Sequence, residues 1–387
     1  MDSVTIAHSA AETLLGHDRN VQVREITQFA AVEVPDWIER HGQPVQYPYD
    51  LLLRAGEVGL LELPFLPRSI NVPQPMVDYI HTLEEIAFHS FTIAQMIHIQ
   101  VLASVPLIEF GTSDQKFQWR KELLSGRSIA ANCISEFDAG SDVVNIQTTA
   151  VRESGNYSIS GRKRWATPAA EASVLNVLCK TGEGPQGLTM FFLPADESGW
   201  KIGESEEKLA VAALPTNSVV FEAVQAEEKS IVGKRGRGLL VASQIFDRGR
   251  LGIAACGLGI ANRALSEARG YTKQRRQFGQ PVFDFQAIGF NFSELSIRVS
   301  AAQALLTEVA SRFDSSLRGA ELTVLAAKAK ICAVDAAIDC VSKSLRMVGG
   351  IGYTLDQPYA RLLQEALLLQ FIEGTREALL QTVKNSL

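Results

Sequence analysis

A carboxylate near the C-terminus stands in an almost wholly apolar stretch. Residues 367–375 read Leu-Leu-Leu-Gln-Phe-Ile-Glu-Gly-Thr, so that two apolar side chains directly precede Glu373. Burial among such side chains disfavours the charged form of a carboxyl group and raises its basicity. A carboxylate of this kind can remove a proton from a weak carbon acid. The local sequence favours a plainer role for Glu373, capping a following helix that has Thr375 or Glu377 in its first turn.

The composition limits the classes of protein to which the chain can belong. The chain has 387 residues, a net charge of −6, 46% hydrophobic and 21% charged residues. This acidic balance argues against nucleic acid as the main partner. The five cysteines form no C-x-x-C pair, which indicates reduced thiols in a cytoplasmic protein. We expect no metal site, since no His, Cys and carboxylate cluster has ligand spacing. The first twenty residues lack the pattern of a signal peptide, so we expect none. We also expect no membrane span, because the sequence has no run of 18 apolar residues.

The elements that must position Glu373 fall into three stretches. Residues 2–125 have the apolar spacing of helices, most clearly over 77–105. From residue 129 to about 232 the pattern changes to short β-prone segments separated by Gly, Pro and Asn. Long alanine-rich helices follow, over 239–271, 285–313 and 320–348, with a last helical stretch over 358–386. We therefore predict domains at 1–128, 129–234 and 235–387.

Three motifs in this order resemble those of the acyl-CoA dehydrogenase family. Residues 133–142, Cys-Ile-Ser-Glu-Phe-Asp-Ala-Gly-Ser-Asp, resemble the family's T-E-P-x-A-G-S-D. Residues 275–279, Arg-Arg-Gln-Phe-Gly, with Phe-Gln at 285–286, are similar to its R-x-Q-F-G and F-Q pair. Gly-Gly-Ile-Gly-Tyr at 349–353 and Ile-Glu-Gly-Thr at 372–375 are similar to its G-G-x-G-Y and Y-E-G-T. The resemblance implies an α+β protein with an N-terminal helical domain, a middle antiparallel β-barrel and a C-terminal four-helix bundle. It also implies a homotetramer or dimer.

The resemblance implies FAD as the cofactor and Glu373 as the catalytic base that removes the α-proton of an acyl thioester. Flavin is needed because protein side chains alone cannot accept a hydride. The residues that match flavin contacts of the same subunit are Asn132, Ile134, Ser135, Ser141, Trp165 and Thr167. Those that match contacts to the adenine and pyrophosphate, in part from a neighbouring subunit, are Arg275, Gln277, Phe278, Gln286, Arg346, Gly349, Gly350, Thr375 and Glu377.

Most of these residues also have a plainer interpretation. Trp165 could be a core side chain in a strand, and the Gly-containing turn before Ser141 could be an ordinary β-turn. Arg275 could belong to a solvated basic helix end.

Asp247 and Arg250, together with Gly374, are expected near the substrate. A surface ion pair at a helix start is an equally compatible interpretation of Asp247 and Arg250. Some relatives carry the base on that helix; glycine at the matching position, Gly249, leaves the assignment with Glu373.

The main departure from the family pattern lies in residues 209–218. Relatives that act on CoA have a basic residue here, whereas this chain reads Leu-Ala-Val-Ala-Ala-Leu-Pro-Thr-Asn-Ser. Loss of a cation weakens the binding of a phosphate-rich ligand, so an acyl carrier protein thioester is an alternative to CoA. The electron acceptor would be electron-transfer flavoprotein or O₂. Two further functions stay open. One is a flavin-dependent monooxygenase, which Glu373 disfavours because such relatives generally lack a glutamate at this position. The other is an inactive homologue without flavin.

Overall fold

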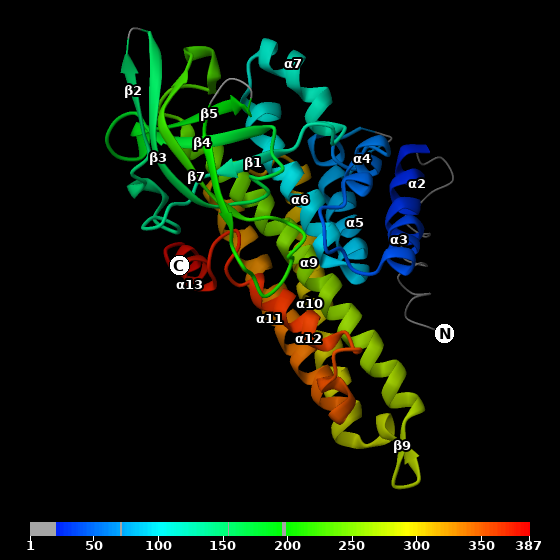
Figure 1. Ribbon diagram of the computed structural model, residues 1–387. Helices are drawn as coiled ribbons and strands as arrows, with labels where there is room; N and C mark the ends of the chain where they lie inside the picture. Colours follow the sequence, from blue (N-terminus) through cyan, green and yellow to red (C-terminus); the bar gives the residue numbers. More distant parts are fainter. Residues whose placement is uncertain (1–20, 70–71, 154, 196–198) are drawn as a thin grey trace.

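The computed structural model describes residues 21–69, 72–153, 155–195 and 199–387. A helical region and a β-sheet lie side by side at one end, and long helices extend away from both (Figure 1). The predictions for residues 1–20, of helix and of no signal peptide, fall outside this part of the chain.

The N-terminal region is helical, as its apolar spacing predicts. Its α-helices are α2 (Val21–Gln28), α3 (Val34–His41), α4 (Tyr49–Glu57), α5 (Pro75–His89), α6 (Phe91–Val105) and α7 (Ser113–Leu124). The pattern over 77–105 is two helices, because Ser90 adopts an extended conformation and its hydroxyl accepts a hydrogen bond from the Ile93 N–H as the N-cap of α6. The stretch Phe91–Phe110 is long and apolar enough to cross a membrane, but 94% of its most apolar 18 residues are buried inside the protein. Its burial marks it as a core helix.

The middle region is an open, mixed sheet. Its strands are β1 (Ala130–Cys133), β2 (Thr149–Glu153), β3 (Asn156–Ala166), β4 (Val174–Lys180), β5 (Leu188–Pro194), β6 (Lys201–Ser205), β7 (Asn217–Ala226) and β8 (Ile231–Val232). They are ordered β6-β7-β3-β2-β4-β5-β8, with β1 beside β4. β1 and β2 both pair with β4 in parallel, and the other pairs are antiparallel. The prediction of an antiparallel β-barrel was therefore wrong.

Packing against helices explains why the sheet stays open. Strands β4 and β5 are buried almost throughout. One face of the sheet has a core of its own, which includes Tyr157, Phe191 and Phe221. The opposite face packs on α6, α7 and the start of α9 (Gly238–Gln274) in a second core. A sheet that buries one face against helices has no need to close on itself.

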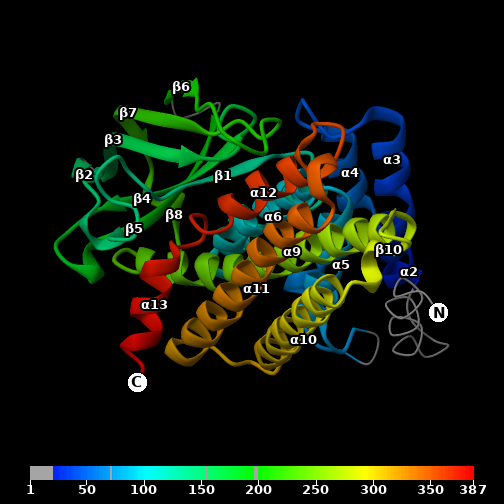
Figure 2. The ribbon, with the colours of Figure 1, turned by 90° about the horizontal axis from the view of Figure 1, so that it is seen from below.

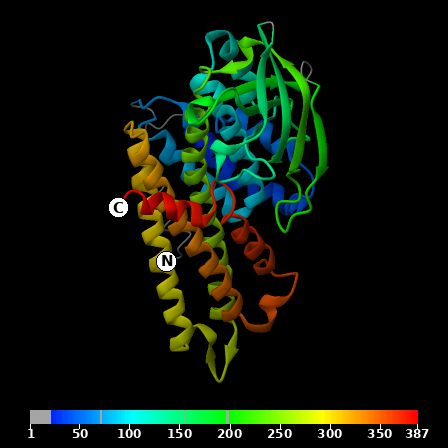
Figure 3. The same cartoon turned by 90° about the vertical axis from the view of Figure 1, so that its left-hand side faces the viewer.

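The C-terminal region is built on three long helices, α9, α10 (Gln286–Asp314) and α11 (Ala320–Met347), which lie side by side with α12 (Tyr359–Leu368) (Figure 2). The hairpin of β9 (Arg276–Gln277) and β10 (Gln280–Pro281) forms the far tip of the bundle. The last predicted helical stretch is divided, since the chain leaves α12 and turns before α13 (Arg376–Lys384). Figure 3 shows α13 crossing the bundle helices at the level of the sheet. Glu373 lies in that turn.

Candidate active site

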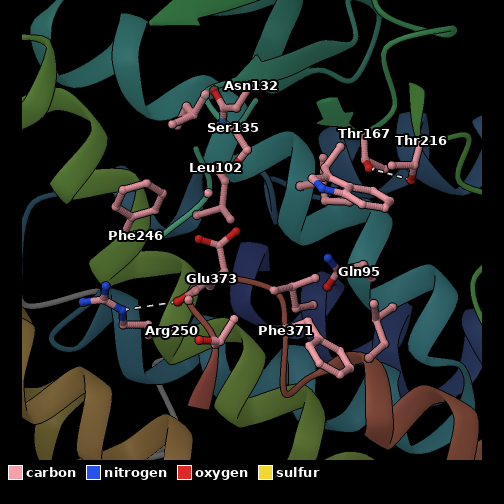
Figure 4. A pocket seen from close by; sticks show the side chains of 18 of the residues that line it. Gln95, Leu102, Asn132, Ser135, Thr167, Thr216, Phe246, Arg250, Phe371 and Glu373 are labelled. Carbon is pink, nitrogen blue, oxygen red and sulfur yellow. Dashed lines mark hydrogen bonds between the residues drawn. The ribbon is translucent and has the colours of Figure 1, made fainter. Parts of the chain in front are cut away.

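A cavity of about 840 Å³ lies where the sheet, α6, α9 and the turn between α12 and α13 meet. This volume is within the range of small-molecule and cofactor sites. Apolar side chains line most of it, and a smaller number of polar groups face into it from the strand ends and from the turn. Figure 4 shows Glu373 rising into the cavity between Phe246 and Gln95.

Glu373 occupies an unusual backbone conformation at the cavity wall. Its φ is 54°, and that of Gly374 is 98°. Left-handed backbone is uncommon for residues other than glycine and is kept only where surrounding contacts hold it. Thr375, whose hydroxyl accepts from the Ala378 N–H, is the N-cap of α13. The plainer interpretation of Glu373 as that cap was therefore wrong.

Two cations hold the turn through its backbone. Lys330 on α11 donates from Nζ to the carbonyl oxygens of Ile372 and Gly374. Arg250 on α9 donates from Nε to the carbonyl oxygen of Glu373, at 3.4 Å. Three successive carbonyl groups thus accept hydrogen bonds from cationic side chains. These bonds fix the two peptide groups that flank the Glu373 side chain.

The Glu373 carboxyl is buried, and Oε2 has no hydrogen-bond partner. Burial raises its pKa to about 7, while the positive charges of Lys330 and Arg250 oppose the increase. The ammonium of Lys330 is itself buried, and burial lowers its pKa to about 8. A carboxylate with a pKa near neutrality and an unpaired oxygen has the properties required of a general base.

Gly249 on α9 leaves the space that the Glu373 carboxyl occupies. A Cβ added at Gly249 would lie 2.4 Å from Glu373 Oε2 and 2.5 Å from its carboxyl carbon. A buried histidine fixes the backbone here. The Gly249 carbonyl can only accept, so His98 Nε2 donates to it at 3.2 Å, and His98 Nδ1 accepts from the Tyr79 hydroxyl at 3.0 Å. Burial lowers the pKa of His98 to about 4, which keeps the ring neutral.

We expect Gly249→Ala to lower turnover by about 100-fold, because an ångström-scale displacement of a catalytic group has costs of that order. The measurement is kcat/KM with the best acyl thioester found for the wild type. Gly270→Ala, on the same helix but with no heavy atom within 4 Å of the added Cβ, is the control. It should keep full activity. Equal losses in both variants would show that α9 does not tolerate alanine in general.

Arg250 also belongs to a buried ion pair. Its Nη1 lies 3.1 Å from Asp247 Oδ1, and Asp247 Oδ2 accepts from the Thr323 hydroxyl at 2.9 Å. Asp247 is 1% exposed and lies well inside α9, so the interpretation as a surface pair at a helix start was wrong. Arg250 and Gly374 line the cavity, whereas Asp247 supports Arg250 from behind.

A second buried ion pair shapes the sheet side of the cavity. Lys163 is completely buried and donates to the Ile134 carbonyl at 3.0 Å and to Glu136 Oε1 at 2.9 Å. The carboxylate of Glu136 also accepts the backbone N–H groups of Gln147 and Thr148. Burial alone would raise the pKa of Glu136, but these charged and polar partners together lower it. The pair thereby holds the segment that presents Ser135 to the cavity.

The predicted flavin residues of the same subunit lie at the cavity. Those that line it are Asn132, Ile134, Ser135, Ser141, Trp165 and Thr167. Thr375, predicted among the adenine and pyrophosphate contacts, lines it as well. Trp165 belongs to β3 but is 52% exposed, so its interpretation as a core side chain was wrong. Its φ is 62°, and the Arg164 guanidinium stacks on its ring, 4.2 Å from the centroid. Beside it, the Thr167 hydroxyl lies 2.8 Å from that of Thr216. A flat aromatic face beside hydroxyl groups suits an aromatic ring system with polar edges.

The remaining predicted cofactor residues lie outside the cavity of their own chain. They are Arg275, Gln277, Phe278, Gln286, Arg346, Gly349, Gly350 and Glu377, all of them exposed. Arg275, Gln277 and Phe278 lie at the tip hairpin of the bundle, far from the sheet (Figure 1). Phe278 is 94% exposed with φ of 50°. One subunit therefore does not bring these residues to its own cavity.

Sequence reasoning missed several residues at the site. Lys330 and Lys163 act through contacts with segments far away in sequence, which local patterns do not reveal. Lys208 directly precedes the segment described as lacking a cation; it lines the cavity and donates to the Leu214 carbonyl at 2.9 Å. Gln95 lies in a helix that was recognised, but its position facing the cavity was not predicted.

No group of three or more His, Cys, Asp or Glu residues in the described ranges could hold a metal ion.

Comparison with known proteins identifies the family. The N-terminal, middle and C-terminal domain models of acyl-CoA dehydrogenase match residues 18–127, 131–224 and 236–387. The chain belongs to the acyl-CoA dehydrogenase family. It is thus an oxidoreductase that acts on CH–CH groups. It is 31% identical over 356 residues to the short-chain specific acyl-CoA dehydrogenase of Clostridium acetobutylicum, covering 91% of this chain and 93% of that protein.

Two further similarities support the assignment to the acyl-CoA dehydrogenase family. The chain is 33% identical over 330 residues to cyclohexane-1-carbonyl-CoA dehydrogenase of Geobacter metallireducens, covering 85% of this chain and 86% of that protein. The structure of butyryl-CoA dehydrogenase from Megasphaera elsdenii superposes with a TM-score of 0.87 at 27% identity, covering 96% and 99% of the two chains.

Proposed function

We propose that this acyl-CoA dehydrogenase family member oxidises an acyl thioester to its α,β-enoyl form, with Glu373 as the base that removes the α-proton. The observation that carries the proposal is the Glu373 carboxyl at the cavity wall, which is buried, has no hydrogen-bond partner at Oε2 and has its pKa raised to about 7. The pKa lies close to neutral pH, where proton abstraction by a carboxylate is most effective.

The rest of the turn can stabilise the charge that develops on the thioester oxygen. Within the described residues no hydrogen bond engages the backbone N–H of Glu373. A donor that is free before substrate binds is suited to an oxyanion. The bonds from Lys330 and Arg250 to the neighbouring carbonyl groups hold this N–H and the carboxyl in one fixed arrangement.

FAD is the cofactor, and the cavity residues fit it. The half-exposed indole of Trp165 and the Thr167 and Ser135 hydroxyl groups would face its ring system. Bound there, FAD supplies the acceptor for the β-hydride. Ser141, exposed in its Gly-containing turn, would contact the pyrophosphate.

We also propose a homo-oligomer, because the exposed residues of the bundle tip would complete the cofactor site of a neighbouring copy. The large apolar side chains exposed on the bundle include Phe278, Phe290, Ile297, Tyr353 and Leu355. Large apolar side chains that gather in an exposed patch mark interfaces, and burial against a neighbouring copy would remove these five from water. Electron-transfer flavoprotein is the proposed acceptor. A solved structure described as an electron transferring flavoprotein of Acidaminococcus fermentans is similar to this chain, with 27% identity and a TM-score of 0.87.

A carrier-protein thioester is a second candidate substrate, favoured by the charges at the cavity. Its lining cations are Arg164, Lys208 and Arg250. Each already has an internal partner: Glu206 at 2.9 Å, the Leu214 carbonyl and Asp247, respectively. No cation of the described lining is therefore left for the additional phosphates of CoA. A single phosphopantetheine arm needs fewer such contacts.

Anaerobic bleaching of the flavin tests both parts of the proposal. The purified protein should be yellow, and an acyl thioester should bleach it. Straight, branched and cyclic acyl groups are offered both as CoA esters and on an acyl carrier protein. A colourless protein, or one that no thioester bleaches, would contradict the proposed reaction. Equal rates with the CoA ester and the carrier-bound ester of one acyl group would contradict the preference for a carrier.

A further inference from the structure

Gln95 on α6 is a buried amide without a partner at the cavity wall. It is 8% exposed, it lines the cavity, and its Oε1 is shut off from solvent with no hydrogen bond. Among the buried side-chain oxygen and nitrogen atoms without a partner in the described ranges, Gln95 Oε1 and Glu373 Oε2 are those whose residues line the cavity. The base accounts for Glu373 Oε2. Gln95 Oε1 has no counterpart in the proposed reaction.

Another glutamine on the same helix shows what a satisfied amide looks like. Gln100 is 1% exposed, and its Nε2 donates to the carbonyl oxygens of Leu123 at 2.9 Å and Ser128 at 2.8 Å. Its Oε1 accepts from the Ala130 N–H at 3.2 Å. Gln100 thus joins α6 to β1 as a structural group. Gln95 has no such bonds and cannot serve the fold in the same way.

Several of the side chains that line the cavity with Gln95 are apolar. Ile99 and Leu102, one and two turns further along α6, also line the cavity, as do Leu368 and Phe371 from the end of α12 and the turn after it. In the view of Figure 4, Gln95 and Phe371 both lie on the other side of Glu373 from Phe246. An unpaired amide here costs free energy in the ligand-free protein, and a leucine or methionine would avoid that cost. A ligand that supplies the missing bond recovers it.

We propose that the acyl group of the substrate carries a hydrogen-bond donor, a hydroxyl or an N–H, which pairs with Gln95 Oε1 once the amide turns about its last side-chain bond to present that oxygen to the cavity. This inference rests on the proposed thioester dehydrogenation and specifies its substrate class. The thioester carbon that loses a proton lies at Glu373, and the donor lies further along the acyl chain, at the α6 wall. Gln95 then selects functionalised acyl groups over plain alkyl chains of equal size.

The test compares matched thioesters in the flavin-containing enzyme. A ladder of ω-hydroxyacyl and ω-acetamidoacyl thioesters is paired with acyl groups in which a methylene or methyl replaces the polar atom. At the favoured length the polar member should have a kcat/KM higher by about 10- to 100-fold, the effect of one buried hydrogen bond gained or lost. In Gln95→Leu and Gln95→Met this preference should disappear or reverse. Ile99→Val, a change in volume at the same wall, should alter both members of a pair alike.

Thermal unfolding of the flavin-containing protein without thioester gives a readout independent of turnover. Gln95→Leu should raise the midpoint, because it removes an unpaired buried polar group. The proposal is overturned if alkyl partners are preferred at every length by the same factor in wild type and variants, or if the midpoint falls in both Gln95→Leu and Gln95→Met. Failure of every thioester to bleach the wild-type flavin would instead contradict the proposed function itself.

Discussion

Replacement of Glu373 by glutamine is expected to slow anaerobic flavin bleaching by an acyl thioester by about 10²- to 10⁴-fold, the usual contribution of general base catalysis. Glutamine keeps the size of the side chain but cannot accept the α-proton. In the wild type the bleaching rate should rise with pH through about 7, because burial raises the Glu373 pKa to that value and only the carboxylate is active. The residual rate of Glu373→Gln should show no such step.

Glu84 provides a matched control for this experiment. It lies on α5, outside the cavity lining, and burial raises its pKa to about 7 as well. Its Oε1 accepts from Asn262 Nδ2 at 3.0 Å. Glu84→Gln should bleach at close to the wild-type rate and keep the pH step. Unchanged bleaching in Glu373→Gln, with the step retained, would refute the base assignment.

Lys330→Met is expected to lower kcat by about 100-fold, because the Glu373 turn loses the donor that holds two of its carbonyl groups. The variant should also be less stable, by roughly 1–3 kcal/mol for each carbonyl left unpaired. Loss of the ammonium charge removes an interaction that lowers the Glu373 pKa. The pH step in the bleaching rate should therefore move to higher pH. We expect Lys330 to act as a positioning residue, through the base.

The pH profile distinguishes this role from simple damage to the fold. Lys328→Met, two residues earlier on α11, is the control and should leave the step in place. Lys330→Arg, which keeps the positive charge, should restore much of the wild-type step position. A Lys330→Met variant that folds, with the step at the wild-type pH and a full rate, would show that the turn holds its conformation without Lys330.

The sequence predicts the helices well where one face is buried along their whole length. The helix expected over 320–348 is observed as Ala320–Met347, since alanines and larger apolar residues recur on the side that packs on α9. The openness of the sheet could not be predicted. Strands β4 and β5 are buried on both sides, and their sequence does not show whether a second sheet or a set of helices covers the outer face.

The candidate site was predictable to the extent that it depends on local sequence. The apolar run before Glu373 indicates a buried carboxyl, and the structure places it so. The left-handed backbone of the turn depends instead on Lys330, which lies 42 positions earlier in the chain than Ile372. Gln95 could not be distinguished from Gln100 by sequence, because only the fold decides which amide finds partners.

The hydrophobic core that joins the two helical regions has a consequence for synthesis of the chain. One continuous cluster contains side chains of α5 and α6, such as Leu83 and Ile97, together with Leu258 of α9 and Val334 of α11. The apolar faces of α5 and α6 therefore leave the ribosome well before the helices that cover them. Until α9 and α11 emerge, the nascent N-terminal region exposes a surface that chaperones bind and that aggregates readily. A fragment that ends near residue 128 should accordingly be insoluble, although family models treat that region as a domain.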